Sequence, residues 1–320
     1  MSTSREQTIT KSCSLCKNDL PLDSFRKSQN GKYGRRSHCK MCEKDKLQEK
    51  TYTIGGKAFV VCAGCGSKIS AGLYGLMREP YCKQCIPNIS PAPWSIELKY
   101  LAGLVAADGT LESGGDHRIG FNNTDPNLMK TFLYLIQSPR IASVHEYDNP
   151  NHKPAHNIYV RDRGYYNLFV KVGLIPRKSL CLGEVDLPRG TDGKITDFFL
   201  FVRGAFEGDG SISHAKAKSA NMTISSGSKN YLVWLRKEIA VSLDDPEIIQ
   251  NCSISDPKAE GKNPELYLRM QYVPVLYKKM YLDYDNTKFS LPFLKTTVSL
   301  KTLGLPYKRA RLEYWVNKHK

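Results

Sequence analysis

The stretch LAGLVAADGTL occupies residues 101–111, and the related stretch FVRGAFEGDGSI occupies residues 201–212. Each is an apolar segment containing small residues that ends on an aspartate followed by a glycine, at Asp108 and Asp209. A single copy would be typical of an ordinary helix end. Two copies whose aspartates are 101 positions apart indicate an internal duplication.

The residues after each stretch predict the same order of elements. In the first segment, a helix over 96–107 precedes strands near 110–115 and 117–123, a helix near 125–137, strands near 142–148 and 156–162, and a helix near 164–174. In the second, a helix over 197–208 precedes strands near 211–216 and 220–226, a helix over 228–243, strands near 248–255 and 265–271, and a helix over 273–282. The sequence therefore predicts an α+β fold of two αββαββα repeats.

Small residues on the two opening helices predict how the repeats meet. Gly103 in the first helix and Gly204 and Gly208 in the second leave slim faces on which helix backbones can pack closely. If the helices pair about a pseudo-twofold axis, Asp108 and Asp209 lie side by side at their carboxyl ends. The helix dipoles and the mutual repulsion of two carboxylates make that arrangement costly unless a divalent cation lies between them.

These residues resemble the two motifs of the LAGLIDADG homing endonucleases of the single-chain kind. The resemblance covers about residues 96–320 and includes GLIPRKSLCLGEVDLP before the second motif. It implies a saddle of two sheets on double-stranded DNA, and a site-specific cut through both strands. The last acidic residues of the motifs, Asp108 and Asp209, would bind Mg²⁺ or Mn²⁺, together with the carbonyls of Ala107 and Gly208. The earlier acidic position is Ala106 in one copy and Glu207 in the other, and it is not a metal ligand in that family.

Basic residues supply the remaining candidates. Phosphodiester hydrolysis needs neutralisation of charge on the phosphate, and the basic residues predicted to stabilise the transition state are Lys178 first and Lys295 second. Basic residues on alternate strand positions of a saddle would contact DNA. The predicted DNA contacts are Arg118, Lys153, Arg161, Arg163, Lys216, Lys218, Lys262 and Arg269.

Eight of the ten cysteines form four C-x-x-C pairs: Cys13 and Cys16, Cys39 and Cys42, Cys62 and Cys65, and Cys82 and Cys85. The spacing predicts two structural Zn²⁺ sites of four thiolates each, with pairing between the quartets left open. His38 is an alternative ligand, although a surface histidine is the simpler interpretation. Cys181 and Cys252 are interpreted as ordinary core or strand cysteines. The first finger resembles short treble-clef-like fingers that accompany phage nucleases.

The predicted domains are a first zinc finger at 1–54, a ribbon-like second finger at 55–90, a proline-rich linker at 91–95, and repeats at 96–195 and 196–320. The net charge of +16, from 47 basic and 31 acidic residues, favours a polyanionic partner. Without a long apolar run or a signal segment, we expect a cytoplasmic protein without membrane contact, associated with the nucleoid of a bacterial or phage-infected cell. We expect a monomer.

Three alternatives stay open at this point. A maturase with this fold would bind intron RNA, and a transcription regulator would bind DNA without cutting it. The presence of both Asp108 and Asp209 favours the nuclease. The fingers would extend the DNA footprint, or else act as a protein-interaction module.

Overall fold

The computed structural model describes residues 10–14, 17–28, 32–42, 59–61, 68–70, 94–112, 117–137, 141–147, 155–176, 178–215, 219–255, 263–291 and 296–318. The chain divides into two units, Met1–Cys85 and Ile86–Lys320, and each is treated by itself below. The predicted limits of the individual fingers and repeats stay predictions.

The first unit is built of short antiparallel pairs. The pairs are β1 (Thr10–Ser12) with β2 (Asp19–Pro21), β3 (Phe25–Lys27) with β4 (Arg35–Cys39), and β5 (Phe59–Val61) with β6 (Lys68–Ser70). Two 3-10 turns, η1 (Leu22–Ser24) and η2 (Lys32–Gly34), flank β3. Phe25 is fully buried against Cys13 and Cys39. So small an apolar cluster stabilises a fold only weakly, because little surface is removed from water.

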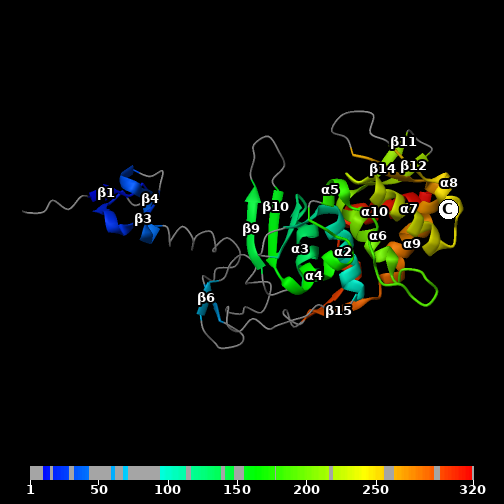
Figure 1. Ribbon diagram of the computed structural model, residues 1–320, viewed down its shortest axis with the longest axis horizontal. Helices are drawn as coiled ribbons and strands as arrows, with labels where there is room; N and C mark the ends of the chain where they lie inside the picture. Colours follow the sequence, from blue (N-terminus) through cyan, green and yellow to red (C-terminus); the bar gives the residue numbers. More distant parts are fainter. Residues whose placement is uncertain are drawn as a thin grey trace, which may run out of the picture. The chain divides into compact units, whose positions relative to one another are not determined.

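Two helices lie side by side at the centre of the second unit, α2 (Ile96–Asp108) and α6 (Phe198–Asp209) (Figure 1). Ser95 caps α2 by accepting a hydrogen bond from the Leu98 N–H group. Lys99, at the start of α2, donates to the Asp197 carboxylate that precedes α6, at 3.0 Å. The two helices are therefore joined at their amino ends as well as along their length.

A four-stranded antiparallel sheet follows each of these helices. The first has the order β7 (Gly109–Leu111), β8 (Arg118–Asn123), β10 (Ala155–Arg161), β9 (Ile141–Tyr147). The second has the order β11 (Gly210–Ala215), β12 (Ser219–Ser225), β14 (Glu265–Leu268), β13 (Ser253–Ile254). The identical strand order confirms the predicted duplication, and Figure 1 shows the sheets on either side of α2 and α6.

Apolar residues on one face of each sheet pack against helices. In the first repeat these helices are α3 (Pro126–Ile136) and α4 (Arg163–Lys171), with the short α5 (Lys178–Cys181) after them. In the second, α7 (Lys229–Leu243) packs against β13 and β14, while α8 (Glu247–Asn251) packs against α7, and α9 (Val273–Met280) packs against α6. Phe121 of β8 stacks on Phe132 of α3 with ring centroids 4.4 Å apart. The α+β fold with two repeats is confirmed.

The structure corrects three expectations. Residues 248–251 lie in helix α8, so only 253–254 of the predicted strand over 248–255 is a strand. Cys181 is exposed, whereas Cys252 is buried as expected. The sequence pattern did not predict the elements beyond α9. These are η4 (Leu282–Tyr284), the hairpin of β15 (Lys288–Leu291) and β16 (Thr296–Ser299), η5 (Leu300–Thr302) and α10 (Pro306–Lys318). η3 (Met270–Tyr272) precedes α9.

Across the described residues, every helix is too short or too polar to cross a lipid bilayer.

Candidate active site

Glycines allow α2 and α6 to pack backbone against backbone. A Cβ atom added at Gly103 would lie 2.1 Å from the carbonyl oxygen of Phe201, and one added at Gly204 would lie 2.4 Å from the carbonyl oxygen of Tyr100. At Gly208 an added Cβ would meet the side chains of Ala107 and Asp108. The three positions therefore require glycine, and they bring the carboxyl ends of the two helices together as predicted.

Asp108 and Asp209 are the last residues of these helices. Asp108 is half-buried, and its Oδ2 accepts a hydrogen bond of 2.8 Å from Nδ2 of Asn123. Removal from water raises the pKa of Asp108, although the Asn123 hydrogen bond opposes the rise. Asp209 keeps surface open to solvent, yet the surrounding protein and the Asp108 carboxylate raise the pKa of Asp209 to about 6. The carboxylates interact, as expected for two acids at one site.

A buried lysine donates hydrogen bonds to backbone carbonyls at the carboxyl end of each of α2 and α6. Nζ of Lys178 donates to the carbonyl oxygens of Ala106 at 2.7 Å and Ala107 at 2.9 Å. Nζ of Lys308 donates to those of Phe206 at 2.9 Å and Glu207 at 2.8 Å. Burial lowers the pKa of both lysines to about 8, while the two aspartates oppose the shift. Four ionisable groups, two acids and two bases, therefore surround one point between the repeats.

The residues fit a divalent cation. Hard oxygen ligands from two adjacent carboxylates suit Mg²⁺ or Mn²⁺, and the absence of a side chain at Gly208 leaves space beside Asp108. The carbonyls of Ala107 and Gly208, predicted to assist, already accept hydrogen bonds from Lys178 and Lys308. Each carbonyl oxygen has a second lone pair, so their role toward a metal stays a prediction.

Glu207, at the earlier acidic position of the second motif, is fully buried and has a structural role. Its carboxylate accepts from Nε of Arg203 at 3.1 Å and from the hydroxyls of Tyr281 and Tyr100. The Arg203 guanidinium lies between the rings of Tyr100 and Tyr281, at 4.7 and 4.6 Å from their centroids. It also donates to the carbonyl oxygens of Leu300 and Leu303. This network fixes the segment before α10, and thereby the helix that carries Lys308.

The predicted DNA contacts are only partly within the described residues. Arg118 and Arg161 are directly opposite each other on β8 and β10, so their side chains share one face of the first sheet. Arg269 is exposed just after β14. Arg163 is the first residue of helix α4 and not part of a strand, and its contact with DNA stays a prediction. Outside the described residues lie Lys153, Lys216, Lys218, Lys262 and the predicted catalytic Lys295.

Sequence reasoning missed Lys308 and Asn123. A signal for Lys308 was present, because the segment IPRK ending at Lys178 and the segment LPYK ending at Lys308 share a proline two residues before the lysine. Each follows a glycine with positive φ, at Gly173 and Gly304. Asn123 carried no such signal, since its role depends on where the end of β8 lies relative to α2.

In the first unit, Cys13, Cys39 and Cys42 have sulfur atoms that all lie within 4.8 Å of one another. The Cys39 N–H group donates to Sγ of Cys13 at 3.3 Å, and that of Cys42 to Sγ of Cys39 at 3.4 Å. Three convergent thiols with amide donors fit a metal such as Zn²⁺. Outside the described residues lie Cys16, Cys62, Cys65, Cys82 and Cys85.

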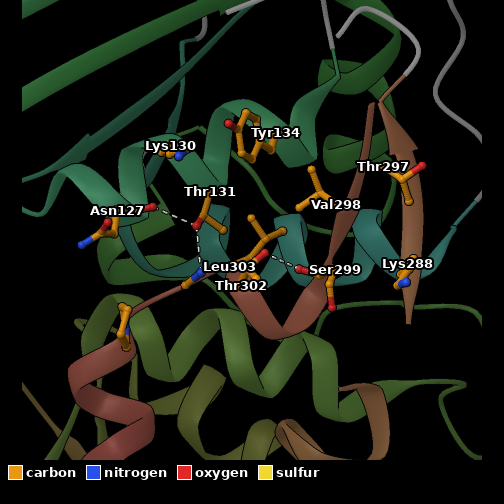
Figure 2. Close-up of a pocket in the computed structure, with 12 residues that line it drawn as sticks. Asn127, Lys130, Thr131, Tyr134, Lys288, Thr297, Val298, Ser299, Thr302 and Leu303 are labelled. Atoms are coloured by element: carbon orange, nitrogen blue, oxygen red, sulfur yellow. Dashed lines mark hydrogen bonds between the residues drawn. The ribbon is translucent and has the colours of Figure 1, made fainter. Parts of the chain in front are cut away.

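A separate pocket lies between α3 and the β15–β16 hairpin (Figure 2). Its wall includes Thr131, whose hydroxyl donates to the carbonyl of Asn127 and accepts from the Gly304 N–H group. This bond ties the first repeat to the segment that precedes α10. Of the predicted catalytic residues that the structure describes, Asp108, Lys178 and Asp209 lie outside its wall.

Neither a protein-family model nor a curated protein matches the sequence. Solved structures similar to the chain include the homing endonuclease I-WcaI bound to its DNA recognition sequence, at 14% identity and TM-score 0.44, over 58% of this chain and 82% of that one. Full-length DUF199/WhiA from Thermatoga maritima aligns at 14% identity and TM-score 0.43, over 73% of this chain and 64% of that one. The N-terminal LAGLIDADG domain of DUF199/WhiA aligns at 16% identity and TM-score 0.41, over 59% and 84%. LAGLIDADG proteins, which the two motifs resemble, are thus among the similar structures. All three TM-scores are below 0.5.

Proposed function

We propose that the protein is a site-specific endonuclease that hydrolyses both strands of double-stranded DNA with divalent metal held by Asp108 and Asp209. The observation that carries the proposal is the meeting of these two carboxylates between two buried lysines at the junction of the repeats. The two carboxylates do not stabilise the fold, because an ionised carboxylate at the carboxyl end of a helix is destabilising. Such costly clusters of groups with shifted pKa are typical of functional sites.

The chain supplies binding and charge around the reacting phosphate. Asp108 and Asp209 would hold Mg²⁺ or Mn²⁺, which when bound neutralises phosphate charge and assists ionisation of the attacking water. Lys178 and Lys308 place a cation on either side of the aspartates, where each stabilises the charge that develops during hydrolysis. Arg118, Arg161 and Arg269 would contact the DNA backbone or base edges. The pseudo-twofold arrangement gives one set of groups for each DNA strand.

The first unit is proposed to bind Zn²⁺ through Cys13, Cys39 and Cys42, with Cys16 as the fourth ligand, and through a second site in the other four paired cysteines. Arg26, Lys27 and Arg36 are exposed on β3 and β4. These cations support the proposal that the fingers contact DNA phosphates beside the cut site. We also propose that the protein acts as a monomer, because one chain contains both repeats.

The test compares cutting with binding in aspartate variants. Duplexes are first enriched from a random library by binding to the wild-type protein in EDTA, and are then incubated with Mg²⁺ or Mn²⁺. We expect Asp108→Asn and Asp209→Asn to reduce cleavage at least about 100-fold and to bind within about threefold of wild type, because each removes a charged metal ligand and little contact area. Asp283→Asn is the matched control, since Asp283 is a surface acid paired with Lys279.

Cutting by either variant at the wild-type rate would contradict the metal-ligand assignment. Tight binding of duplex DNA without any cut, in either metal, would instead support the non-cleaving regulator. Preference for structured RNA over every duplex would support the intron maturase.

A further inference from the structure

The two halves of the site share one framework but differ in polar groups. Asn123 and Ser226 occupy equivalent places, each two residues before the residue that caps the next helix. Oδ1 of Asn123 accepts the N–H group of Asp125 at 2.7 Å, and Oγ of Ser226 accepts that of Ser228 at 3.2 Å. Because the local hydrogen bond is the same, the two positions can be compared directly.

Beyond this shared bond, only Asn123 reaches an aspartate. Its Oδ1 is occupied by a donor, so its amide NH₂ group faces Asp108 and donates to Oδ2 at 2.8 Å. The chain of bonds from Asp125 through Asn123 fixes one oxygen of the carboxylate and leaves the other available. The hydroxyl of Ser226 is on a shorter side chain, and within the described part of the chain no side chain donates a hydrogen bond to Asp209.

The neighbouring strand differs in the same way. His156 is directly opposite Asn123 on β10, so the two side chains lie on one face of the sheet. At the equivalent place in the second repeat, Ser226 donates its N–H group to the carbonyl of Pro264. An imidazole, which can donate and accept hydrogen bonds, therefore has a proline as its counterpart.

A pocket of about 550 Å³ opens on the Asn123 side. Asn123 and His156 form one part of its wall, and Gly208, next to Asp209, forms another. Tyr307, the residue before Lys308, lines it from α10, and the acidic residues Asp125 and Glu207 also line it, as suits a phosphate that enters together with a divalent cation. The wall of the pocket therefore contains an amide, an imidazole and a phenol, and the amide of Asn123 connects the pocket to the carboxylate of Asp108.

We propose that this pocket takes the scissile phosphate of one DNA strand and that this strand is cut before the other. Asn123 is a positioning residue for Asp108, and His156 contacts the phosphate or the attacking water. The inference rests on the proposed nuclease function. In the step itself, the water oxygen forms a bond to phosphorus and one ester P–O bond breaks. The water proton is released to solvent, and the leaving oxygen takes a proton from solvent. A carboxylate held in place needs less reorganisation than a free one, which is why the Asn123 side is the faster one.

The test follows each strand separately. A target duplex labelled with a different fluorophore on each strand is cut by wild-type protein, by Asn123→Ala, by His156→Ala and by Ser226→Ala as the matched control on the other half. We expect wild type to accumulate duplex nicked in one particular strand. Asn123→Ala should slow cutting of that same strand about 10-fold and leave the other strand within about twofold, as for other residues that orient a ligand. His156→Ala should act on the same strand, with partial rescue in His156→Gln, and Ser226→Ala should change neither.

Equal rates for the two strands in wild type, or equal slowing of both strands by Asn123→Ala, would overturn the inference. A second measurement separates this failure from failure of the nuclease proposal. Binding of Mn²⁺ without DNA is followed by loss of the electron paramagnetic resonance signal of free Mn²⁺. We expect Asn123→Ala to weaken the tightest site about 10-fold and Ser226→Ala to leave it unchanged. If Asn123→Ala binds Mn²⁺ as tightly as wild type, the positioning role is overturned even if wild type cuts DNA. If Asn123→Ala binds Mn²⁺ more weakly but wild type cuts no DNA, only the nuclease proposal is refuted.

Discussion

Lys178 and Lys308 lie on either side of Asp108 and Asp209, and each donates to carbonyls at the end of one repeated helix. Replacement by methionine keeps much of the volume but removes the cation. We expect Lys178→Met and Lys308→Met each to lower the single-turnover cleavage rate about 100-fold, with DNA affinity within about threefold, because the charge acts mainly on the transition state. Lys279→Met, at an exposed lysine, is the control. A lysine variant that cuts as fast as this control would contradict the catalytic assignment.

Asp209 is predicted to reduce stability while it serves the site. Its pKa is about 6 in the folded protein against an ordinary value of 3.8, so the folded state holds more protons than the unfolded state between these values. The free energy of unfolding therefore falls as pH rises from about 4 to about 6, and the loss persists above that range. In EDTA at pH 7.5, Asp209→Asn should raise Tm by about 2 °C, a modest value because solvent screens the exposed carboxylate. Calorimetry at pH 4 should show no such gain; a lower Tm in the variant at pH 7.5 would contradict the account.

Among individual residues, those that lie within the repeated motifs could be predicted from the sequence. Asp108, Asp209 and Lys178 all lie at the ends of recognisable phrases, and the structure brings them together. Lys308 was missed because the chain between α9 and α10 departs from the pattern of the first repeat, although LPYK repeats IPRK. Asn123 and His156 could not be found, since their relation to Asp108 depends on strand register and on where β8 ends.

Among the elements, α2 and α6 determine the geometry of the site. We expect Gly103→Ala or Gly204→Ala to lower the free energy of unfolding by about 3 kcal/mol, since the added methyl group must push the helix backbones apart and strain a close-packed interface. Gly183→Ala is the matched control, because an added Cβ there meets nothing within 4 Å. The measurement is urea denaturation of each variant. Equal stability of Gly103→Ala and Gly183→Ala would show that the helices are not in backbone contact.

Element order was predictable because helix and strand periods alternate clearly in both repeats. The errors lie where a short segment can be read either way: EIIQN is apolar enough for a strand, but it forms α8 directly after Pro246. The hairpin of β15 and β16 belongs to one repeat alone, and α10 has only the four-residue α5 as its counterpart, so the duplication predicted neither the hairpin nor the length of α10. Their position is fixed instead by the buried Arg203 and Glu207, a network of tertiary contacts without a sequence period.

For the whole molecule, the two units are expected to respond separately to loss of zinc. In the first unit the apolar core of described residues is little more than Phe25 and its cysteine neighbours, so metal binding must contribute most of the folding free energy. Cys13→Ser should lower the zinc content by one ion per chain and leave the main thermal transition, that of the repeats, unchanged. Elemental analysis and calorimetry provide the measurements. Cys181→Ser, at an exposed cysteine, should change neither quantity; unchanged zinc in Cys13→Ser would exclude Cys13 as a ligand.

The central claim is that the two aspartates at the helix junction cut DNA at a chosen site. It is tested most directly by incubating the purified full chain with a randomised duplex library in Mg²⁺ and, in parallel, in EDTA, and then sequencing every new DNA end. The account predicts breaks in both strands at one recurrent sequence in Mg²⁺ and none in EDTA. Duplexes that bind tightly but acquire no new ends in Mg²⁺ or Mn²⁺ would contradict it.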